Sequence, residues 1–596
     1  MQSIKRVFFQ VLLAACLALA LVGCKTSSSG GGNETSFSLS IIHVNDSHSH
    51  LASETYSLYF NGVKTKVPFG GFPRLTSKIK SLQQAYPDSL ILHAGDMVQG
   101  TIYYTIFKGE ATAAMMNQIP WTAVTLGNHE FDDGNQGLKS FLDQLNAPVV
   151  CANVDASNSI LAGYWQPYKV VEINGEKVGI IGLETAKKTK ESSSPGEDII
   201  FQDEKETIQQ YVQELEDQGI NKIIVLSHYG MENDLNLAKE VEGIDVIVDG
   251  DSHSLLGNYT SYGVSSQYDN YPQIVNSPDG HKVCVVSAWQ YAYAVGHLNV
   301  DFNDQGEVVN CNGVTTLLLG NSFRQKNNEG EYVEVNDTVK NQILELINNS
   351  EDKLEIVPED PTALAALQTY KDQIEEQSNT VIGRAAEDLP HLRIPDAEHP
   401  KGSEIAPLVA KSFYEKVPYA DLCIQNAGGV RISIDAGDIT IGEVYTLLPF
   451  ANTLYTLQLT GAEVKQVLED ALANFLDNGG STGSFPYAYG IRYDIDLSQP
   501  QNQRISNLEI MDKQTKQFHP IDPNTLYTVV TNSYIAAGKD GYTTFKTVQD
   551  NGRPGVDTYY DYAMSFVDMV KNLTAQGKEL EKLPREEHCI HSFRGE

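Results

Sequence analysis

The chain has 596 residues, more than one domain usually contains, so we expect two or more domains, each with its own hydrophobic core. Its 77 acidic residues outnumber its 43 Lys and Arg residues and give a formal net charge of −34. A protein this acidic repels a phosphate backbone, which argues against a nucleic-acid partner.

The N-terminus has the pattern of an export signal. Lys5 and Arg6 precede an apolar run from Val7 to Val22, which is too short and wrongly flanked for a membrane-spanning helix. The run ends in Leu21-Val-Gly-Cys24, which resembles a bacterial lipobox. This predicts a signal peptide over residues 1–23, a lipidated Cys24 and a flexible Ser/Gly-rich tether over residues 24–36. The protein would then be an extracytoplasmic lipoprotein, periplasmic or at the cell surface; in the alternative, Cys24 is incidental to an ordinary signal.

The other cysteines are few. Beyond Cys24 the mature chain carries Cys151, Cys284, Cys311, Cys423 and Cys589. Cys284 and Cys311 flank a strand-rich segment and are able to pair in an oxidising compartment. The odd number leaves at least one thiol free, and no spacing resembles a zinc–thiolate site. Any metal is therefore expected to be held by nitrogen and oxygen.

Strands and helices alternate in the first half of the chain. The apolar runs at 38–44, 89–92, 121–124, 222–226 and 244–248 predict strands, and the periodicity at 73–82 and 204–218 predicts helices. This alternation indicates a mostly parallel or mixed sheet with helices on its faces. Ligands bind such sheets at the carboxyl ends of the strands.

Each of these five strands ends in residues that bind metals. A single His at a strand end is more often a packing or surface residue. Five successive strands ending in this way predict a site for two metal ions that share a bridging ligand, formed by Asp46, His48, Asp96, Asn128, His228, Asp251 and His253. His129 follows Asn128, and Asp132 is close enough in sequence to fix the tautomer of His129 and favour its protonated form.

The motifs that carry these residues resemble those of the calcineurin-like metallophosphoesterases, and more narrowly the bacterial 5′-nucleotidase and UDP-sugar hydrolase family. The matching segments are Ile42-His-Val-Asn-Asp-Ser-His48, His93-Ala-Gly-Asp96, Gly127-Asn-His-Glu-Phe-Asp132 and Ser227-His228, and the similarity covers nearly the whole mature chain. It implies an α/β (α+β) fold: a four-layer metallophosphoesterase β-sandwich flanked by helices over residues 37–355, a linker helix over 356–379, and a C-terminal α/β nucleotide-binding domain over 380–596. In this family the linker helix carries a hinge that swings the C-terminal domain over the metals.

The resemblance also implies roles for the site residues. Asp46, His48, Asp96 and His253 would hold one metal ion, and Asp96, Asn128, His228 and Asp251 the second. His129 and Asp132 match the catalytic dyad of the family. Two divalent ions about 3.5–4 Å apart activate a water and clamp the phosphoryl oxygens for in-line attack.

One position departs from the family. A Gly-His-Thr-His motif is usual where this chain has Gly250-Asp-Ser-His253. The carboxylate of Asp251 is a harder ligand than His, which favours Mn²⁺, Mg²⁺ or Co²⁺ over Zn²⁺ and leaves the identity of the metal open. We expect Asp249 to be structural, and His43, His50 and His93 to be packing or surface residues.

The second half of the chain has fewer signals. Strand signals weaken from about residue 309 to 361, apart from a helical stretch at 339–348, and a helix is predicted over 361–376. Asn426-Ala-Gly-Gly-Val-Arg431 follows a predicted strand at 421–425 and alone would be a tight turn with a surface Arg. The resemblance implies a substrate pocket instead: Asn426, Gly429, Arg431 and Arg393 would bind phosphate, Phe450 and Tyr534 would sandwich a base, Asn452 would read the edge of the base, and Asp540 would hold the ribose, with a loop at 479–483 beside them.

The sequence therefore predicts a lipid-anchored enzyme with two divalent metal ions that removes the 5′-phosphate from nucleotides such as AMP, and it leaves open an additional cleavage of UDP-sugars. Alternatives that keep the site are an NAD or dinucleotide pyrophosphatase, a 2′,3′-cyclic phosphodiesterase and a sulfur-chemistry enzyme. A non-catalytic nucleoside-binding lipoprotein is the alternative from another class. The preferred base and the oligomeric state are not indicated.

Overall fold

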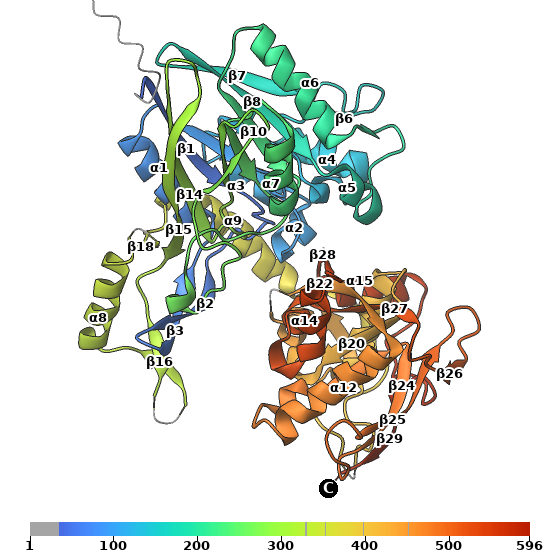
Figure 1. The fold of residues 1–596 in the computed structure, drawn as a ribbon. Helices are drawn as coiled ribbons and strands as arrows, with labels where there is room; N and C mark the ends of the chain where they lie inside the picture. Colours follow the sequence, from blue (N-terminus) through green and yellow to red (C-terminus); the bar gives the residue numbers. More distant parts are fainter. Residues whose placement is uncertain (1–34, 328–329, 352, 397, 451, 596) are drawn as a thin grey trace, which may run out of the picture.

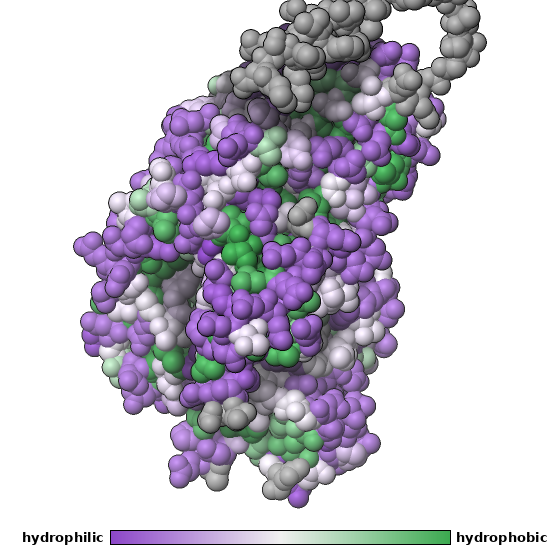
Figure 2. Space-filling model, turned by 90° about the vertical axis from the view of Figure 1, so that its left-hand side faces the viewer, coloured by the Kyte–Doolittle hydropathy of each residue, from purple (hydrophilic) through white to green (hydrophobic). Residues whose placement is uncertain are grey.

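The computed structural model describes residues 35–595 except 328–329, 352, 397 and 451. The predicted signal peptide and Cys24 lie outside these residues. Two folded bodies are joined by the helix α9 (Pro361–Ser378), as Figure 1 shows. Hydrophilic residues cover most of the face drawn in Figure 2, in keeping with the acidic composition. Within the described residues no helix is both long and apolar enough to cross a membrane.

The N-terminal body contains two sheets. The first has ten strands, in the order β17 (Tyr332–Glu334), β16 (Arg324–Lys326), β3 (Val63–Phe69), β15 (Val308–Leu319), β14 (Ala294–Phe302), β1 (Phe37–Val44), β4 (Leu90–His93) and β5 (Ala123–Val124), with β2 (Glu54–Phe60) beside β3 and β18 (Leu354–Ile356) beside β15. The second has six, in the order β12 (Gln273–Asn276), β13 (Lys282–Val286), β11 (Val246–Asp249), β10 (Ile223–His228), β8 (Glu176–Glu184) and β7 (Tyr168–Ile173).

The five strands predicted to carry the site are all present, but they do not share one sheet. β1, β4 and β5 belong to the first sheet, whereas β10 and β11 belong to the second. The single sheet inferred from the alternation is therefore wrong, and the sandwich implied by the family resemblance is correct. Alternation indicates the order of elements along the chain but not which strands share a sheet. After β5 the chain enters the second sheet through β7 and β8.

Apolar side chains from both sheets form the centre of the sandwich. Leu39, Leu92, Ile180, Leu226 and Val248 are among the buried residues of this shared core. On the outer face of the first sheet pack α1 (Phe72–Ala85), α3 (Glu110–Met116) and part of α9, and on that of the second pack α6 (Glu204–Asp217) and α7 (Met231–Glu240). The resulting order of layers is helix, sheet, sheet, helix.

A disulfide joins the two sheets. Cys284 in β13 is bonded to Cys311 in β15, 27 residues apart in sequence. Cys151, Cys423 and Cys589 are buried free thiols. The pairing that the sequence allowed is therefore present.

Removing this disulfide is expected to destabilise the N-terminal body. A cross-link closing a loop of this length restricts the unfolded chain, so the Cys284→Ala/Cys311→Ala variant should lose about 3 kcal/mol of unfolding free energy. Denaturant unfolding of the variant against oxidised wild type measures this loss. A variant with the same unfolding midpoint as the oxidised wild type would contradict this prediction. So would a wild-type midpoint that does not change when reductant is added.

Strands continue after residue 309, although the strand signals of the sequence weaken there. β15 is a long strand that pairs with β14 along most of its length and with β3 and β18 at its far end. Asn310, Asn312 and Gly313 interrupt its apolar pattern. Tertiary pairing outweighs the local strand propensity here. The helix expected at 339–348 is present as α8 (Asp337–Asn348).

The C-terminal body has its own core. Its larger sheet runs β23 (Pro486–Tyr489), β20 (Leu422–Asn426), β27 (Leu526–Asn532), β22 (Thr453–Thr460) and β28 (Val556–Asp561), and a second runs β26 (Phe518–Pro520), β25 (Ile505–Met511), β24 (Ile491–Asp496) and β29 (Ile590–Arg594). The pair β19 (Val381–Ala385) and β21 (Gly437–Thr440) stands apart. Helices α10 (Ile405–Lys416), α12 (Gly461–Leu476) and α15 (Tyr562–Ala575) pack on these strands.

Helix α9 is more than a connector. Ala363 and Leu367 are fully buried in the core of the N-terminal body, where α9 contacts α1 and α3. The same helix also contacts α11 (Ile441–Leu447) of the C-terminal body. β18 extends to Ile356, one residue past the predicted boundary at 355, and pairs with β15. The first half of the predicted linker is thus part of the N-terminal fold.

Candidate active site

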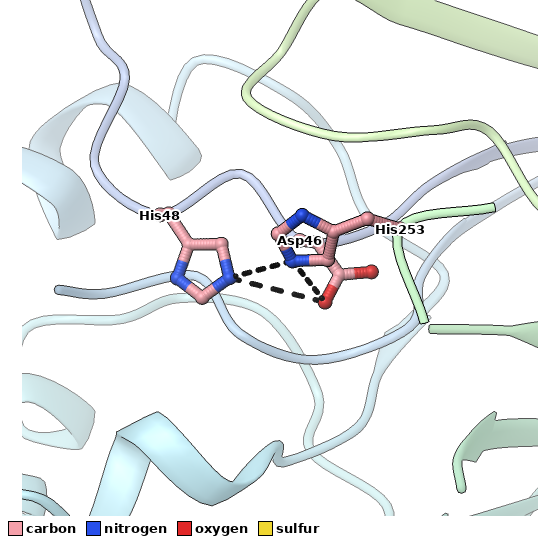
Figure 3. A group of neighbouring side chains, drawn as sticks. All are labelled: Asp46, His48 and His253. Carbon is pink, nitrogen blue, oxygen red and sulfur yellow. Dashed lines mark hydrogen bonds and ion pairs between the residues drawn. The ribbon is translucent and has the colours of Figure 1, made fainter. Parts of the chain in front are cut away.

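The predicted metal ligands come together where the strands of the two sheets end. Asp46, His48 and His253 form one group able to hold a cation, and Asp46, Asp96 and His228 form another. Figure 3 shows the first group, in which His48 Nε2 lies 3.1 Å from His253 Nε2 and His253 Nε2 lies 3.4 Å from Asp46 Oδ1. Asp46 belongs to both groups, and Asp96 of the second group lies with its Oδ2 3.1 Å from His228 Nε2 and 3.5 Å from His48 Nε2 of the first group.

The three imidazoles are oriented by hydrogen bonds on their far side. The Nδ1 atom of His228 lies 2.7 Å from the Ala94 carbonyl oxygen, and that of His48 lies 3.3 Å from the Val98 carbonyl oxygen. The Nδ1 atom of His253 lies 2.5 Å from Gln290 Oε1. A carbonyl oxygen only accepts, so Nδ1 carries the proton and Nε2 presents its lone pair to the site. Two such lone pairs facing each other across 3.1 Å repel unless a proton or a metal ion lies between them.

Glycines let the site loops approach closely. A Cβ atom on Gly127 would lie 2.2 Å from Asp96 Oδ1, and one on Gly250 would lie 2.2 Å from the Ala94 carbonyl oxygen. Either substitution would push apart two loops that carry ligands. The glycines beside the sequence motifs are therefore required by packing at the metal centre.

The remaining ligand positions fit a cation as well. Asn128 is buried, and neither atom of its amide group has a hydrogen-bond partner among the described residues. A buried amide without partners is costly unless something absent from the chain binds it. Asp251 Oδ1 lies 3.7 Å from His228 Nε2, and the same carboxylate forms an ion pair with Lys188. Asp251 is thus at the edge of the site rather than within either group, and its role as a ligand remains a prediction.

The predicted dyad is formed. His129 Nδ1 lies 2.6 Å from Asp132 Oδ2, and the backbone N–H of His129 donates to Asp96 Oδ1 over 3.0 Å. Burial lowers the pKa of His129, but the carboxylates of Asp132 and Asp96 outweigh burial and raise the pKa above its ordinary value. Nε2 of His129 is buried and has no hydrogen-bond partner among the described residues. A protonated His129 would offer that N–H to an anion.

Glu130 has a positioning role that the sequence did not reveal. Its carboxylate accepts hydrogen bonds from the backbone N–H groups of Asp96, Met97, Val98 and Gly127, at 2.6–3.2 Å. It thereby ties the loop after β4 to the loop after β5. Glu130 lies inside the Gly127-Asn-His-Glu-Phe-Asp132 motif, but a charged residue in a loop gives no sign that it folds inward.

Replacing Glu130 by Ala is expected to loosen both loops. Four donors would lose a buried charged acceptor, which should cost about 3 kcal/mol of unfolding free energy and weaken metal binding. Glu130→Gln keeps the shape and one acceptor oxygen and should lose less. Thermal unfolding and metal content after dialysis measure both effects; Glu130→Ala with wild-type values would exclude this positioning role.

The other predictions near the motifs can also be checked. His43, His50 and His93 lie outside both metal groups. His43 packs against Tyr271, and burial, followed by the charge of His297, lowers the pKa of His43 to about 3. His93 Nε2 lies 3.1 Å from Ser47 Oγ, and Asp249 accepts a hydrogen bond from the Ser252 hydroxyl. These contacts agree with structural roles.

The predicted substrate residues form a second site, in the C-terminal body. All eight line one pocket of about 300 Å³, together with Gly428, Ser481 and Gly483: Arg393, Asn426, Gly429, Arg431, Phe450, Asn452, Tyr534 and Asp540. Phe450 and Tyr534 are 45% and 43% exposed, although aromatic residues are usually buried. Asp540 accepts hydrogen bonds from the Asn426 amide and the Tyr534 hydroxyl, at 3.0 and 3.1 Å.

Tyr559, in β28, covers the metal centre from the C-terminal body. Its ring stacks on His48 with the centroids 4.8 Å apart and meets the rings of His129 and His253 at 4.6 and 4.9 Å. Its hydroxyl donates to the Asp251 carbonyl oxygen over 3.1 Å. No sequence motif surrounds Tyr559, so only the fold reveals this contact.

Two family models match the chain. The calcineurin-like phosphoesterase model matches residues 39–255, and the model of the 5′-nucleotidase C-terminal domain matches residues 381–547. The first range contains all the predicted metal ligands and the second contains the predicted substrate pocket. The expected family is confirmed in both halves of the chain.

Whole-length relatives agree. An NAD 5′-nucleotidase of Haemophilus influenzae is 42% identical over 89% of this chain and 90% of its own length, and a probable 5′-nucleotidase of Treponema pallidum is 39% identical over 94% and 96%. The solved structure of the Haemophilus influenzae NAD nucleotidase is 40% identical and matches with a TM-score of 0.83, covering 94% of this chain and 99% of that one. The chain therefore belongs to the 5′-nucleotidase family, with a calcineurin-like phosphoesterase domain and a 5′-nucleotidase C-terminal domain.

Proposed function

We propose that this protein is an extracytoplasmic 5′-nucleotidase that uses two divalent metal ions to release phosphate from nucleoside monophosphates. One observation carries the proposal: a charged centre whose residues are able to hold cations and a pocket with an exposed aromatic pair occur in the same chain. The first suits phosphoryl transfer, and the second suits a base and its ribose.

The residues at the metal centre have different proposed roles. The chemistry that two divalent ions supply is activation of a water and neutralisation of phosphoryl charge. Asp46, His48, Asp96 and His253 would hold one ion, and Asp96, Asn128, His228 and Asp251 the other. His129 donates a hydrogen bond from Nε2 to the phosphoryl group as charge develops, and Asp132 holds the His129 ring in place. Mixed nitrogen and carboxylate ligands suit Mn²⁺, Co²⁺, Zn²⁺ or Mg²⁺. We would test Mn²⁺ and Co²⁺ first.

The pocket in the C-terminal body would set specificity. A base lies between Phe450 and Tyr534, each contributing on the order of 1 kcal/mol by stacking. Asn452 binds the edge of the base, and Asp540 binds the ribose hydroxyls. Arg393 and Arg431 supply the positive charge that a phosphate requires.

Turnover then requires a different placement of the two bodies. Of the described residues, no predicted metal ligand lines the 300 Å³ pocket of Phe450 and Tyr534, and Tyr559 covers the metal centre. Asn452 and Tyr534 do line the larger cleft that also includes Asp251 and His253. We propose that the C-terminal body reorients about the second half of α9, which carries Tyr559 away and brings the pocket to the metals. The buried first half of α9 stays fixed.

Cleavage of NAD is a second candidate function. It is favoured by the similarity to the NAD 5′-nucleotidase of Haemophilus influenzae, which matches at 42% identity in sequence and at a TM-score of 0.83 in structure. The same centre would cut the diphosphate bridge of a dinucleotide and then the resulting monophosphate. UDP-sugars offer the same bridge to the site.

An exported lipoprotein anchored through Cys24 is the proposed setting. The lipobox-like sequence before Cys24 supports it, and so does the disulfide between Cys284 and Cys311, because such bonds persist in oxidising compartments. Labelling the expressed protein with a lipid precursor, with Cys24→Ala as the control, tests the anchor. Labelling of the Cys24→Ala variant equal to wild type would exclude it.

The function is tested by offering AMP, UDP-glucose, NAD and 2′,3′-cyclic AMP in parallel to the purified protein with Mn²⁺ or Co²⁺. Products are followed by chromatography, because the first cut of the last three substrates frees no inorganic phosphate. We expect adenosine and phosphate from AMP. The relative rates of cleavage rank the other substrates against AMP. Binding of adenosine without turnover of any substrate would instead favour a binding lipoprotein.

A further inference from the structure

A lysine, Lys188, lies beside the metal centre and belongs neither to the predicted metal ligands nor to the predicted substrate residues. Lys188 lies in α5 (Ala186–Ser192), and its ammonium forms an ion pair with Oδ1 of Asp251. Its side chain is 22% exposed and lies 4.8 Å from the centre of the Tyr559 ring. It lines a cleft of about 1400 Å³ that also includes Asp251 and His253. Lys188 therefore has a predicted metal ligand on one side and an open cleft on the other.

The backbone of α5 is held against the site. The N–H of Ala186 donates to the carboxylate of Glu204 over 2.8 Å, and the Thr189 hydroxyl donates to the Thr185 carbonyl over 2.6 Å. The helix also contacts the turn Asn128–Phe131, which carries the dyad histidine. The base of Lys188 is thus fixed relative to the metal centre, whereas its four-carbon stem lets the ammonium move.

Charge decides what this ammonium contacts. The centre contains the carboxylates of Asp46, Asp96 and Asp251, and Lys188 balances part of their charge. Divalent ions on these carboxylates take over that balance and repel the ammonium from Asp251. Asp557 and Glu204 also line the cleft, but a phosphate group held by the metal ions would be the anion that arrives with the substrate. Among the described Lys and Arg residues that line the cleft, Lys188 is the one paired with a predicted metal ligand.

We infer that Lys188 leaves Asp251 when the metal ions bind and contacts a non-bridging phosphoryl oxygen of the substrate. The inference rests on the proposed function and adds a phosphate-binding residue from the N-terminal body. The ammonium stabilises the phosphoryl group as a point charge, beside the hydrogen bond from His129.

The test uses Lys188→Met, which keeps the apolar stem, and Lys188→Arg, which keeps the charge. Lys187→Ala is the matched control, because Lys187 is the neighbouring lysine on the same helix and lines the same cleft. Metal content is measured by mass spectrometry, and binding of inorganic phosphate to the Mn²⁺-loaded proteins by calorimetry. Steady-state kinetics with AMP follow.

We expect Lys188→Met to keep its metal ions and to bind phosphate roughly tenfold more weakly, with kcat/KM for AMP reduced about 10- to 100-fold. Lys188→Arg should recover part of both losses, and Lys187→Ala should match wild type. Wild-type phosphate affinity in Lys188→Met would overturn the inference. So would a weaker phosphate affinity that is explained by loss of metal ions from the variant.

The phosphate-binding measurement needs no turnover, which separates the two proposals. If wild type hydrolyses AMP and Lys188→Met behaves identically, the inference fails and the proposed function stands. If wild type hydrolyses nothing but binds phosphate through Lys188, the proposed function fails and the binding role of Lys188 stands.

Discussion

Asp96→Ala is expected to abolish hydrolysis, with the rate falling at least about 10³-fold, the loss typical when one electrostatic stabiliser is removed from a site. Asp96 Oδ2 lies within 3.5 Å of both His228 and His48, so this one carboxylate serves both halves of the centre. Its other oxygen accepts the backbone N–H of His129. The variant should therefore lose both metal ions together rather than one.

Metal content by mass spectrometry, combined with AMP hydrolysis, measures this result. Asp245→Asn is a suitable control, because Asp245 is also a carboxylate held by a backbone N–H, that of Ile223, at the opposite end of β10. The control should keep its metal ions. An Asp96→Ala protein that retained one tightly bound ion and substantial activity would show that Asp96 does not bridge.

His129→Ala is expected to remove the catalytic hydrogen bond and leave the metals in place. Its Nδ1 is bound to Asp132, and its Nε2 is buried without a partner among the described residues, so the ring is poised to donate to an anion. We expect kcat to fall about 10²- to 10⁴-fold with metal content unchanged. Asp132→Asn, which still allows a hydrogen bond to Nδ1 but removes the charge, should fall less.

The split between kcat and KM is the decisive readout for His129. An interaction made mainly in the transition state lowers kcat and kcat/KM together, whereas a residue that only binds substrate raises KM. A His129→Ala variant with normal kcat and raised KM would reduce His129 to a binding residue. Circular dichroism of the variant shows whether its fold is intact.

Much of the site was predictable because metal chemistry uses few residue types at fixed places. Asp46, Asp96 and Asn128 each follow a buried apolar strand, His228 is the last residue of one, and strand ends can be found from the sequence. The exposed pair Phe450 and Tyr534 was predictable only through the family resemblance, since residue type alone favours burial for both.

Other features depend on contacts between segments far apart in the chain. Tyr559 lies more than 500 residues from His48, yet the two rings stack. Lys188 follows a strand like many surface lysines, and only the fold places it on Asp251. The division of the strands into two sheets and the pairing of β15 likewise follow from tertiary packing.

Hydrolysis of nucleotides by a two-metal centre requires that activity depend on bound divalent ions. The most direct test is titration of chelator-treated protein with Mn²⁺ while adenosine and phosphate release from AMP are followed. We expect no activity before metal is added and full activity at two ions per chain. Activity that persists in chelator, or none with any divalent metal despite a folded protein that binds adenosine, would contradict it.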